Sequence, residues 1–513
     1  MGNMITFGIA HAVINATKLT FRSVCFSNTF YIFVLSNKWR MNKLELALGN
    51  ENTSSIITAL KEKNYDIASW LSVKKDYEPD LHNIVTDHVG RKDKVRKDEE
   101  GRILSMDKAS RTFIGLEKLH TERISQFMFS IPVKRIYHNT ENNSKREEIA
   151  KVLELIYKHS RIDKENPRRA ESYFASCQIF TIWYTVKKKN NLYGFPCDYK
   201  LKCKTISPMD GYDLYPLFDE YGDMLAMSYE YKISNNGNDI IYFETYTANK
   251  HYLWKRDDKS QWVEAKPEED IEILKIPGSY LWRKKPIFYG LSHIREELEY
   301  TISRSSDVVA YNSAPVLKVV GEITGTESKG EAQRIFRVEN GGDVGYVSWS
   351  QSVEALKYHV ETLNNLYWTQ AQMPDISFFN MKGLGNIGYD ARMTMFTDAY
   401  LKIGKESGEF IEFFERECNV IKAFLGKMRT DLANELDNVE VEHIITPYVQ
   451  KDEDAVINRL VKANGGKPLL SHLDSIKMAD FSYDAQKTYE AIIEEEARAT
   501  GARMNDLFNE GAV

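Results

Sequence analysis

The sequence is short of cysteine, and this shortage excludes a disulfide scaffold. Its five cysteines are odd in number and scattered, and no two have CxxC spacing. Cys197 and Cys203 lack a histidine placed as a zinc site requires. We therefore expect reduced thiols, as in a protein folded in the cytosol, and no metal site.

Long apolar runs are also missing. The apolar run from Ser23 to Ser36 is shorter than the ~20 residues of a membrane helix and lacks the cleavage site of a secretory signal. We expect no membrane association. Met41 opens a stretch of ordinary composition, so we expect the native chain to start there and residues 1–40 to be an upstream extension. Residues 1–64 together are interpreted as an N-terminal extension or arm.

An excess of positive charge is absent as well. The 513 residues include 68 Lys and Arg against 74 Asp and Glu, a formal net charge of −6. A dedicated high-affinity nucleic-acid binder is normally basic, so this class is disfavoured. A protein that lets DNA pass without holding it remains compatible with this balance, because phosphate contacts cause retention. The length allows two to four domains.

Catalytic motifs are not found either. The chain contains no HExxH and no GxSxG. Residues 383–388 spell the GxGxxG dinucleotide fingerprint, but they follow a helix and a proline loop where a strand would be needed. We expect no catalytic residue, no cofactor and no bound metal.

What is present divides the chain into segments of different texture. Thr53 to Ser55 offer an N-cap for a short helix, and the mixed-charge run 91–100 is interpreted as a solvated loop. Glu147 to His159 has helical periodicity, with Ile149, Val152, Leu153 and Ile156 on one face. Residues 173–274 alternate aromatic and β-branched residues, and the turn 235–238 indicates a hairpin. This region is predicted to be antiparallel β structure.

Two helices are predicted to flank a small α/β insertion. Ser292 caps the first, which runs from His293 to about Asn312, and Ser352 opens the second, which runs to about Ala371. Between them the pattern predicts a strand over 315–321, a short helix over 326–336 and a strand over 345–349.

A glycine-punctuated loop follows the second helix. Pro374 should end that helix, and Gly383, Gly385 and Gly388 allow unusual backbone conformations. The loop is nevertheless apolar, with one lysine, whereas an ordinary solvated loop is polar. Such a loop is expected to touch something outside its own subunit.

An unusually long helix is predicted over 391–425. Gly404 and Gly408 lie in its middle, where each glycine costs about 1 kcal/mol, so we expect a kink. A strand over 439–449 follows, then helices over 453–463 and 485–499, with Ser471 capping a short segment between them.

This order of elements resembles the portal proteins of tailed bacteriophages, of the siphophage type. The resemblance covers roughly residues 65–507 and is carried most specifically by 373–377 through 389–391 and by 466–471 with the helix 485–499. Residues 287–292 are likewise similar to the entry into the first stem helix of the family. The low positive charge of the loop departs from the family pattern, since Lys382 is its only cation.

The resemblance implies an α+β, mainly helical portal fold. Its parts would be a wing (65–286), a stem helix (287–312), a clip (313–351), a second stem helix (352–372), a tunnel loop (373–390), a long kinked helix with a wing strand (391–449) and a crown with the C-terminal tail (450–513).

The resemblance also implies a function. The family forms a ring, generally of twelve subunits, at one capsid vertex of the virion, and double-stranded DNA is packaged and ejected through its centre. The implied partners are the terminase, the head–tail adaptor, and the major capsid and scaffolding proteins, with assembly in the host cytoplasm. The implied site residues are Phe378, Phe379, Asn380, Met381, Lys382, Gly383, Leu384, Gly385, Asn386 and Gly388 in the tunnel loop, and Glu331, Arg334, Arg337 and Trp349 in the clip.

Two alternative functions remain open at this point. The chain could be a phage-associated nuclease or hydrolase with its site in 173–274, or a monomeric adaptor or shell protein. Independently, the loop could be a static plug of subunit contacts, and the long helix could be a core helix inside a monomer. The absent motifs favour the non-catalytic conduit.

Overall fold

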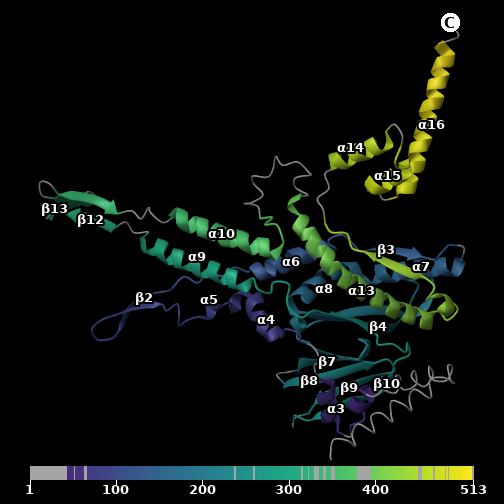
Figure 1. Cartoon of the computed structure of the whole chain (residues 1–513), viewed down its shortest axis with the longest axis horizontal. Helices are drawn as coiled ribbons and strands as arrows, with labels where there is room; N and C mark the ends of the chain where they lie inside the picture. The colour runs from purple at the N-terminus through teal and green to yellow at the C-terminus, as the bar shows by residue number, and fades with distance from the viewer. Residues whose placement is uncertain are drawn as a thin grey trace, which may run out of the picture. The chain divides into compact units, whose positions relative to one another are not determined.

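The computed structural model describes most of the chain beyond residue 42. The described residues are 43–50, 52–62, 66–141, 143–235, 238–257, 260–312, 316–321, 323–328, 334–338, 342–347, 353–377, 394–448, 453–465, 468–479, 481–482 and 484–510. They form two compact units, residues 1–373 with 400–447 and residues 374–399 with 448–513. The fold is mixed α+β, with more helix than strand among these residues (Figure 1).

The first unit begins with short helices and a hairpin. Helices α3 (Thr53–Leu60), α4 (Trp70–Tyr77) and α5 (Asn83–Thr86) precede the hairpin of β1 (Lys94–Lys97) and β2 (Ile103–Asp107). The cap of α3 is Asn52, whose side chain accepts from Ser54, so the predicted cap at 53–55 was one residue late. The prediction of a plain loop over 91–100 was also wrong, because β1 lies within it.

Three helices and one strand follow. They are α6 (Leu116–Phe129), β3 (Lys134–His138), α7 (Ser144–Ser160) and α8 (Ile162–Ser176). The predicted apolar face of α7 is confirmed, because Ile149, Val152, Leu153 and Ile156 are all buried in one core cluster. Tyr173 lies in α8, so the β region starts five residues later than predicted.

Two antiparallel sheets form the rest of the predicted β region. A three-stranded sheet has the order β11 (Gly278–Trp282), β4 (Gln178–Asn190), β5 (Cys197–Ile206). A five-stranded meander contains β6 (Asp213–Phe218), β7 (Met224–Asn235), β8 (Asn238–Thr247), β9 (Lys250–Arg256) and β10 (Trp262–Asp270). Asn235 pairs with Asn238, the register that the predicted two-residue turn produces.

Two long helices then pack along each other, α9 (Ser292–Asn312) and α10 (Val353–Ala371) (Figure 1). Their predicted bounds are confirmed within one residue. The segment between them corrects the prediction of a short helix over 326–336. It contains β12 (Val316–Val320), β13 (Ile323–Ser328), β14 (Arg334–Val338) and β15 (Asp343–Val347), in two antiparallel pairs, β12 with β15 and β13 with β14.

The first unit closes with the longest helix among the described residues, α13 (Thr397–Met428). Its apolar residues Phe410, Phe413, Phe414, Ile421 and Leu425 are buried. The 3-10 turn η3 (Ala433–Glu435) leads to β16 (Glu440–Ile444), which pairs with β3 and is shorter than the predicted strand over 439–449.

The second unit contains α14 (Glu453–Asn464), α15 (His472–Ala479) and α16 (Ala485–Glu510). Ser471 caps α15 as predicted, because its Oγ accepts from the N–H of Asp474 at 3.0 Å. The last helix extends eleven residues beyond the predicted end at residue 499.

Candidate functional site

The predicted tunnel-loop residues, Phe378–Asn386 and Gly388, lie outside the described residues. The structure does describe the end of the helix that precedes this loop. The N–H of Met373 donates to the carbonyl of Trp368 at 3.3 Å, and Gln372 has a φ of 53°. A left-handed residue after the last helical turn is a common helix end. The predicted stop ahead of Pro374 is therefore confirmed.

Of the predicted clip residues, Glu331 and Trp349 lie outside the described residues. Arg334 and Arg337 belong to β14, where they pair in register with Ser328 and Gly325 of β13. The backbone thus places both arginines on a two-stranded sheet and not on the predicted helix.

Gly404 and Gly408 both lie within α13, which is assigned as one unbroken helix from Thr397 to Met428. A Cβ atom built on either glycine would meet nothing within 4 Å. Close packing therefore does not explain why these positions are glycine, and the kink stays a prediction.

A buried polar cluster surrounds Arg295 in the first half of α9. Arg295 donates to Glu299 at 2.9 Å, to Glu117 of α6 at 3.1 Å and to Asp76 of α4 at 3.3 Å. We call these residues, together with His82, the α9 cluster. Arg295, Glu117 and Glu299 are buried, and charged groups buried this deeply need partners. Because these partners come from different elements, the cluster connects α4, α6 and α9.

His82 completes the cluster. Its Nδ1 lies 2.6 Å from Oε1 of Glu299, and its Nε2 lies 3.0 Å from the carbonyl oxygen of Asp76. Both partner atoms are oxygens of neighbouring elements, so the imidazole bridges Glu299 and the end of α4. Glu299 also accepts from the backbone N–H of Ile114 at 2.8 Å.

Glu117 is the less satisfied carboxylate of the cluster. Its side chain is fully buried, and no described group bonds its Oε2 atom. Burial outweighs the attraction of Arg295 and raises the pKa of Glu117 to about 7. The proton content of this cluster therefore changes close to neutral pH.

Lys402, in the second turn of α13, forms a second polar contact. Its Nζ donates to the carbonyl oxygen of Ala371 at 2.7 Å and lies 3.0 Å from Nε2 of His120. An ammonium has only donors, so Nε2 of His120 accepts and the ring proton is assigned to Nδ1. Burial lowers the pKa of Lys402 to about 8, although the carboxylate of Glu406 opposes this shift.

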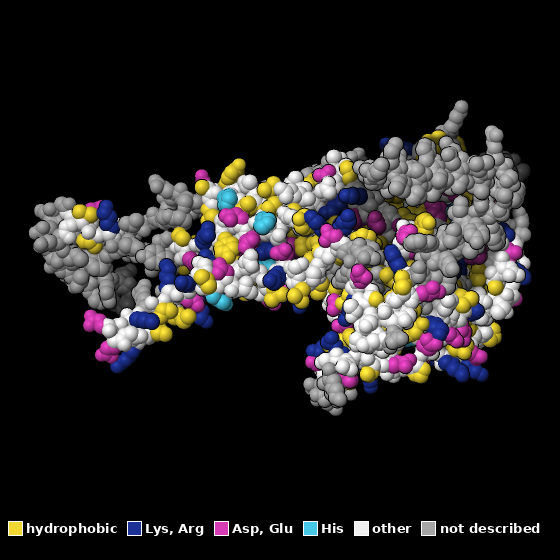
Figure 2. Space-filling view, turned by 60° about the horizontal axis from the view of Figure 1, so that its bottom comes forward, with side chains coloured by type: hydrophobic (Ala, Val, Ile, Leu, Met, Phe, Trp, Pro, Cys, Tyr) yellow, Lys and Arg dark blue, Asp and Glu magenta, His cyan; other side chains and the backbone are white. Residues whose placement is uncertain are grey.

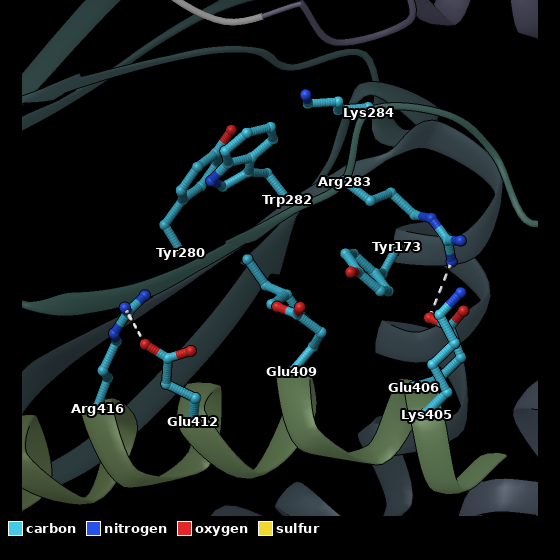
Figure 3. Close-up of a pocket in the computed structure, with 11 residues that line it drawn as sticks. Tyr173, Tyr280, Trp282, Arg283, Lys284, Lys405, Glu406, Glu409, Glu412 and Arg416 are labelled. Carbon is cyan, nitrogen blue, oxygen red and sulfur yellow. Dashed lines mark hydrogen bonds and ion pairs between the residues drawn. The ribbon is translucent and has the colours of Figure 1, made fainter. Parts of the chain in front are cut away.

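A cavity of about 450 Å³ lies one turn further along α13, next to β11 (Figure 3). Arg283 donates to Glu406 at 3.3 Å, Arg416 pairs with Glu412, and Glu409 extends between these pairs toward the cavity (Figure 3). The remaining walls are Tyr173, Tyr280, Leu281, Trp282, Lys284 and Lys405. With charges of both signs on its walls, the cavity has no strong preference for a polyanion.

The described residues contain no group of three or more His, Cys, Asp or Glu side chains that could hold a metal ion. His443 is buried between the rings of Tyr157 and Phe414. Burial lowers its pKa to about 4. Across 43–510, where described, no helix has the length and hydropathy of a membrane span.

The β1–β2 hairpin presents apolar side chains to solvent. Ile103, Leu104 and Met106 of β2 are 65%, 69% and 51% exposed. The hairpin base is nevertheless fixed, because Arg91 pairs with Asp307 of α9, whose other carboxylate oxygen accepts from the N–H of Ser110 at 2.8 Å. Anchored apolar side chains on an exposed two-stranded sheet are typical of an interaction surface.

The helix α10 also has exposed apolar side chains. Tyr358 and Leu366 are 73% and 42% exposed, and their spacing of eight residues places them on one helix face. Elsewhere on the visible surface, basic and acidic side chains are interspersed and form no continuous basic tract (Figure 2).

The sequence did not indicate Arg295, Glu117, His82 or Lys402. Only the i,i+4 spacing of Arg295 and Glu299 hinted at a pair on one helix face. Their partners come from segments up to 282 residues apart, which a single sequence cannot bring together.

The model of the family "Phage portal protein, SPP1 Gp6-like" matches residues 61–502. The comparison with curated proteins gives no match. Similar solved structures include the neck of a native GTA particle computed with C12 symmetry, at 10% identity and a TM-score of 0.37, covering 86% of this chain and 99% of that chain. Another is the virion of a native gene transfer agent particle, at 9% identity and a TM-score of 0.33, with the same coverage.

Proposed function

Because this chain belongs to the SPP1 Gp6-like family of phage portal proteins, we propose that it forms a ring-shaped channel at the capsid vertex through which double-stranded DNA is packaged and ejected. The family match over residues 61–502 is the observation that carries this proposal. Portal proteins are structural and non-enzymatic, so the alternative of a nuclease or hydrolase in 173–274 does not fit the family.

The charge distribution supports a conduit. The net charge is −6, and the visible surface intersperses both signs (Figure 2). Strong phosphate binding would hold DNA in place, because each lysine or arginine contact adds affinity through counterion release. A channel wall that passes a long duplex works with few such contacts.

The exposed apolar residues support self-association. The hairpin strand β2 and the helix α10 each present large exposed apolar side chains. Two different patches on one chain suit a head-to-tail contact, which closes into a ring when the rotation between neighbours is right. A ring, dodecameric as in the family generally, is the assembly we propose.

The parts of the ring are assigned by the family resemblance. We assign α9 and α10 to the stem, β12–β15 to the clip that docks the terminase and the head–tail adaptor, and 373–390 to the tunnel loop. We assign 65–286 and 391–449, which contain the sheets and α13, to the wing. We assign 450–513 to the crown. Capsid and scaffolding proteins would contact the outside of the ring.

The assembly is tested by the mass of the purified protein in solution and by electron micrographs of single particles. A closed ring with a central hole is expected. A monomer would contradict the conduit and favour an adaptor or shell protein.

The role of the loop is tested separately. Deleting residues 378–387 should leave rings that assemble but do not package DNA, and normal packaging by this deletion would contradict the tunnel-loop assignment. Lys382→Ala should lower packaging only modestly, because one charge per subunit is removed. A loss of ring assembly in Lys382→Ala would show that the lysine is structural.

A further inference from the structure

Lys402 lies just after the segment that contains the proposed tunnel loop and bonds Ala371, just before that segment. We propose that Lys402 is a positioning residue, which joins the last turn of α10 to the start of α13 and so fixes the points at which residues 372–401 leave and rejoin the first unit. The functional meaning of this contact depends on the proposed function, but the contact itself does not.

The geometry ties three helices at one atom. Ala371 is the final residue of α10, where the carbonyl groups have no partner within the helix. Nζ of Lys402 reaches this carbonyl at 2.7 Å, and Nε2 of His120 in α6 lies 3.0 Å away. A cation at a helix C-terminus is also favoured by the helix dipole. One ammonium therefore links α6, α10 and α13.

Stability alone does not explain a lysine at this position. Its side chain is buried, and its two partners are a carbonyl and a neutral imidazole, while the nearby carboxylate of Glu406 bonds Arg283. The pKa of Lys402, lowered to about 8, shows that this burial disfavours the ammonium. An apolar side chain of similar length would fill the space without this cost. What the lysine adds is a directional bond between two specific chain segments.

The same helix supplies a matched control. Lys422 is as buried as Lys402, and its Nζ donates to the carbonyl oxygen of Val439 at 2.6 Å. Both lysines are on α13 and bond one backbone carbonyl of another segment. They differ in the segment reached, because Val439 precedes β16 and is remote in sequence from the loop.

The test compares Lys402→Met with Lys422→Met in the full-length protein by hydrogen–deuterium exchange. For Lys402→Met, amide exchange in 372–377 and 394–400 should rise about tenfold or more, because a bond to a charged donor is lost. For Lys422→Met, the rise should appear at 436–444 and leave the loop ends unchanged. Equal exchange at the loop ends in both variants would overturn the proposal, as would unchanged exchange in Lys402→Met.

Conservative variants cover the case in which Lys402→Met does not fold. Lys402→Arg keeps a charged donor and should exchange within about twofold of the parent at the loop ends, whereas Lys402→Gln, a shorter neutral donor, should exchange faster. If Lys402→Gln and Lys402→Arg both match the parent, the proposal fails. Because exchange is measured without DNA, failure of the anchor and failure of the conduit give different results: packaging by rings tests only the latter.

Discussion

Glu117 offers the sharpest test of the buried charges around α9. Its carboxyl bonds Arg295 through one oxygen, and its other oxygen has no bonded partner among the described residues. Replacing it with glutamine keeps the shape and removes the ability to ionise. We predict that Glu117→Gln gains stability relative to the parent as the pH rises from 5 to 8.

The sign follows from proton linkage. The folded-state pKa of Glu117 is about 7, above the ordinary value of 4.5, so the folded state holds this proton more tightly than the unfolded state. The stability that the group contributes is complete below about pH 4.5 and is lost as the pH rises through 7. The difference between these pKa values corresponds to about 3 kcal/mol. The glutamine variant does not lose this stability.

The measurement is the free energy of unfolding by urea for both proteins at pH 5 and pH 8. The difference between variant and parent should grow by roughly 2–3 kcal/mol between the two pH values, and any constant effect of the amide cancels. Glu417→Gln is the control, because this substitution should lower the free energy of unfolding where Glu117→Gln raises it. Glu417 accepts from Arg169 at 2.6 Å and from Nε1 of Trp183 at 2.8 Å, so its replacement should destabilise the protein. A difference for Glu117→Gln that is the same at both pH values would refute the reasoning.

Three further predictions concern assembly, the wing and α13. Leu104→Glu should weaken ring formation measured by mass in solution, whereas Ile233→Glu, at another exposed apolar residue, should not; equal effects would exclude the hairpin as the contact. Arg169→Met should cost about 3–5 kcal/mol in chemical denaturation, because Glu417 is left buried without its cation, and a cost below 1 kcal/mol would contradict this pairing. Gly408→Ala should raise the melting temperature through a gain of about 1 kcal/mol, since its Cβ meets open space, and a lower melting temperature would indicate that the helix needs glycine there.

Much of the secondary structure could be predicted from local pattern. The apolar periodicity of α7 and the caps and proline around α9 and α10 gave bounds close to the observed ones. The prediction of a helix over 326–336 failed because the segment is short and mostly polar, so its few apolar residues define neither a helical nor a strand period. Pairing of β13 with β14 decided the outcome, and that pairing is a tertiary effect.

The candidate site was less predictable than the fold. The proline signal predicted the end of α10 correctly, because proline acts on the local backbone. The partners of Arg295 and Lys402 could not be found in this way, since they are charged residues of ordinary local context on separate segments. Their burial, which makes them informative, appears only when α4, α6, α9 and α13 are brought together.

The polar bonds along α13 suggest how the proposed conduit holds this helix in register. Going along the helix, Lys402 bonds Ala371, Glu406 bonds Arg283, Glu417 bonds Arg169 and Lys422 bonds Val439. Apolar packing alone would hold the helix but tolerate sliding along its axis, because it is non-directional. Directional bonds to four different segments oppose such sliding at intervals over its length. The force that a passing duplex exerts on the proposed channel would then be borne by α6, α8 and the β sheet, and α13 would stay in register.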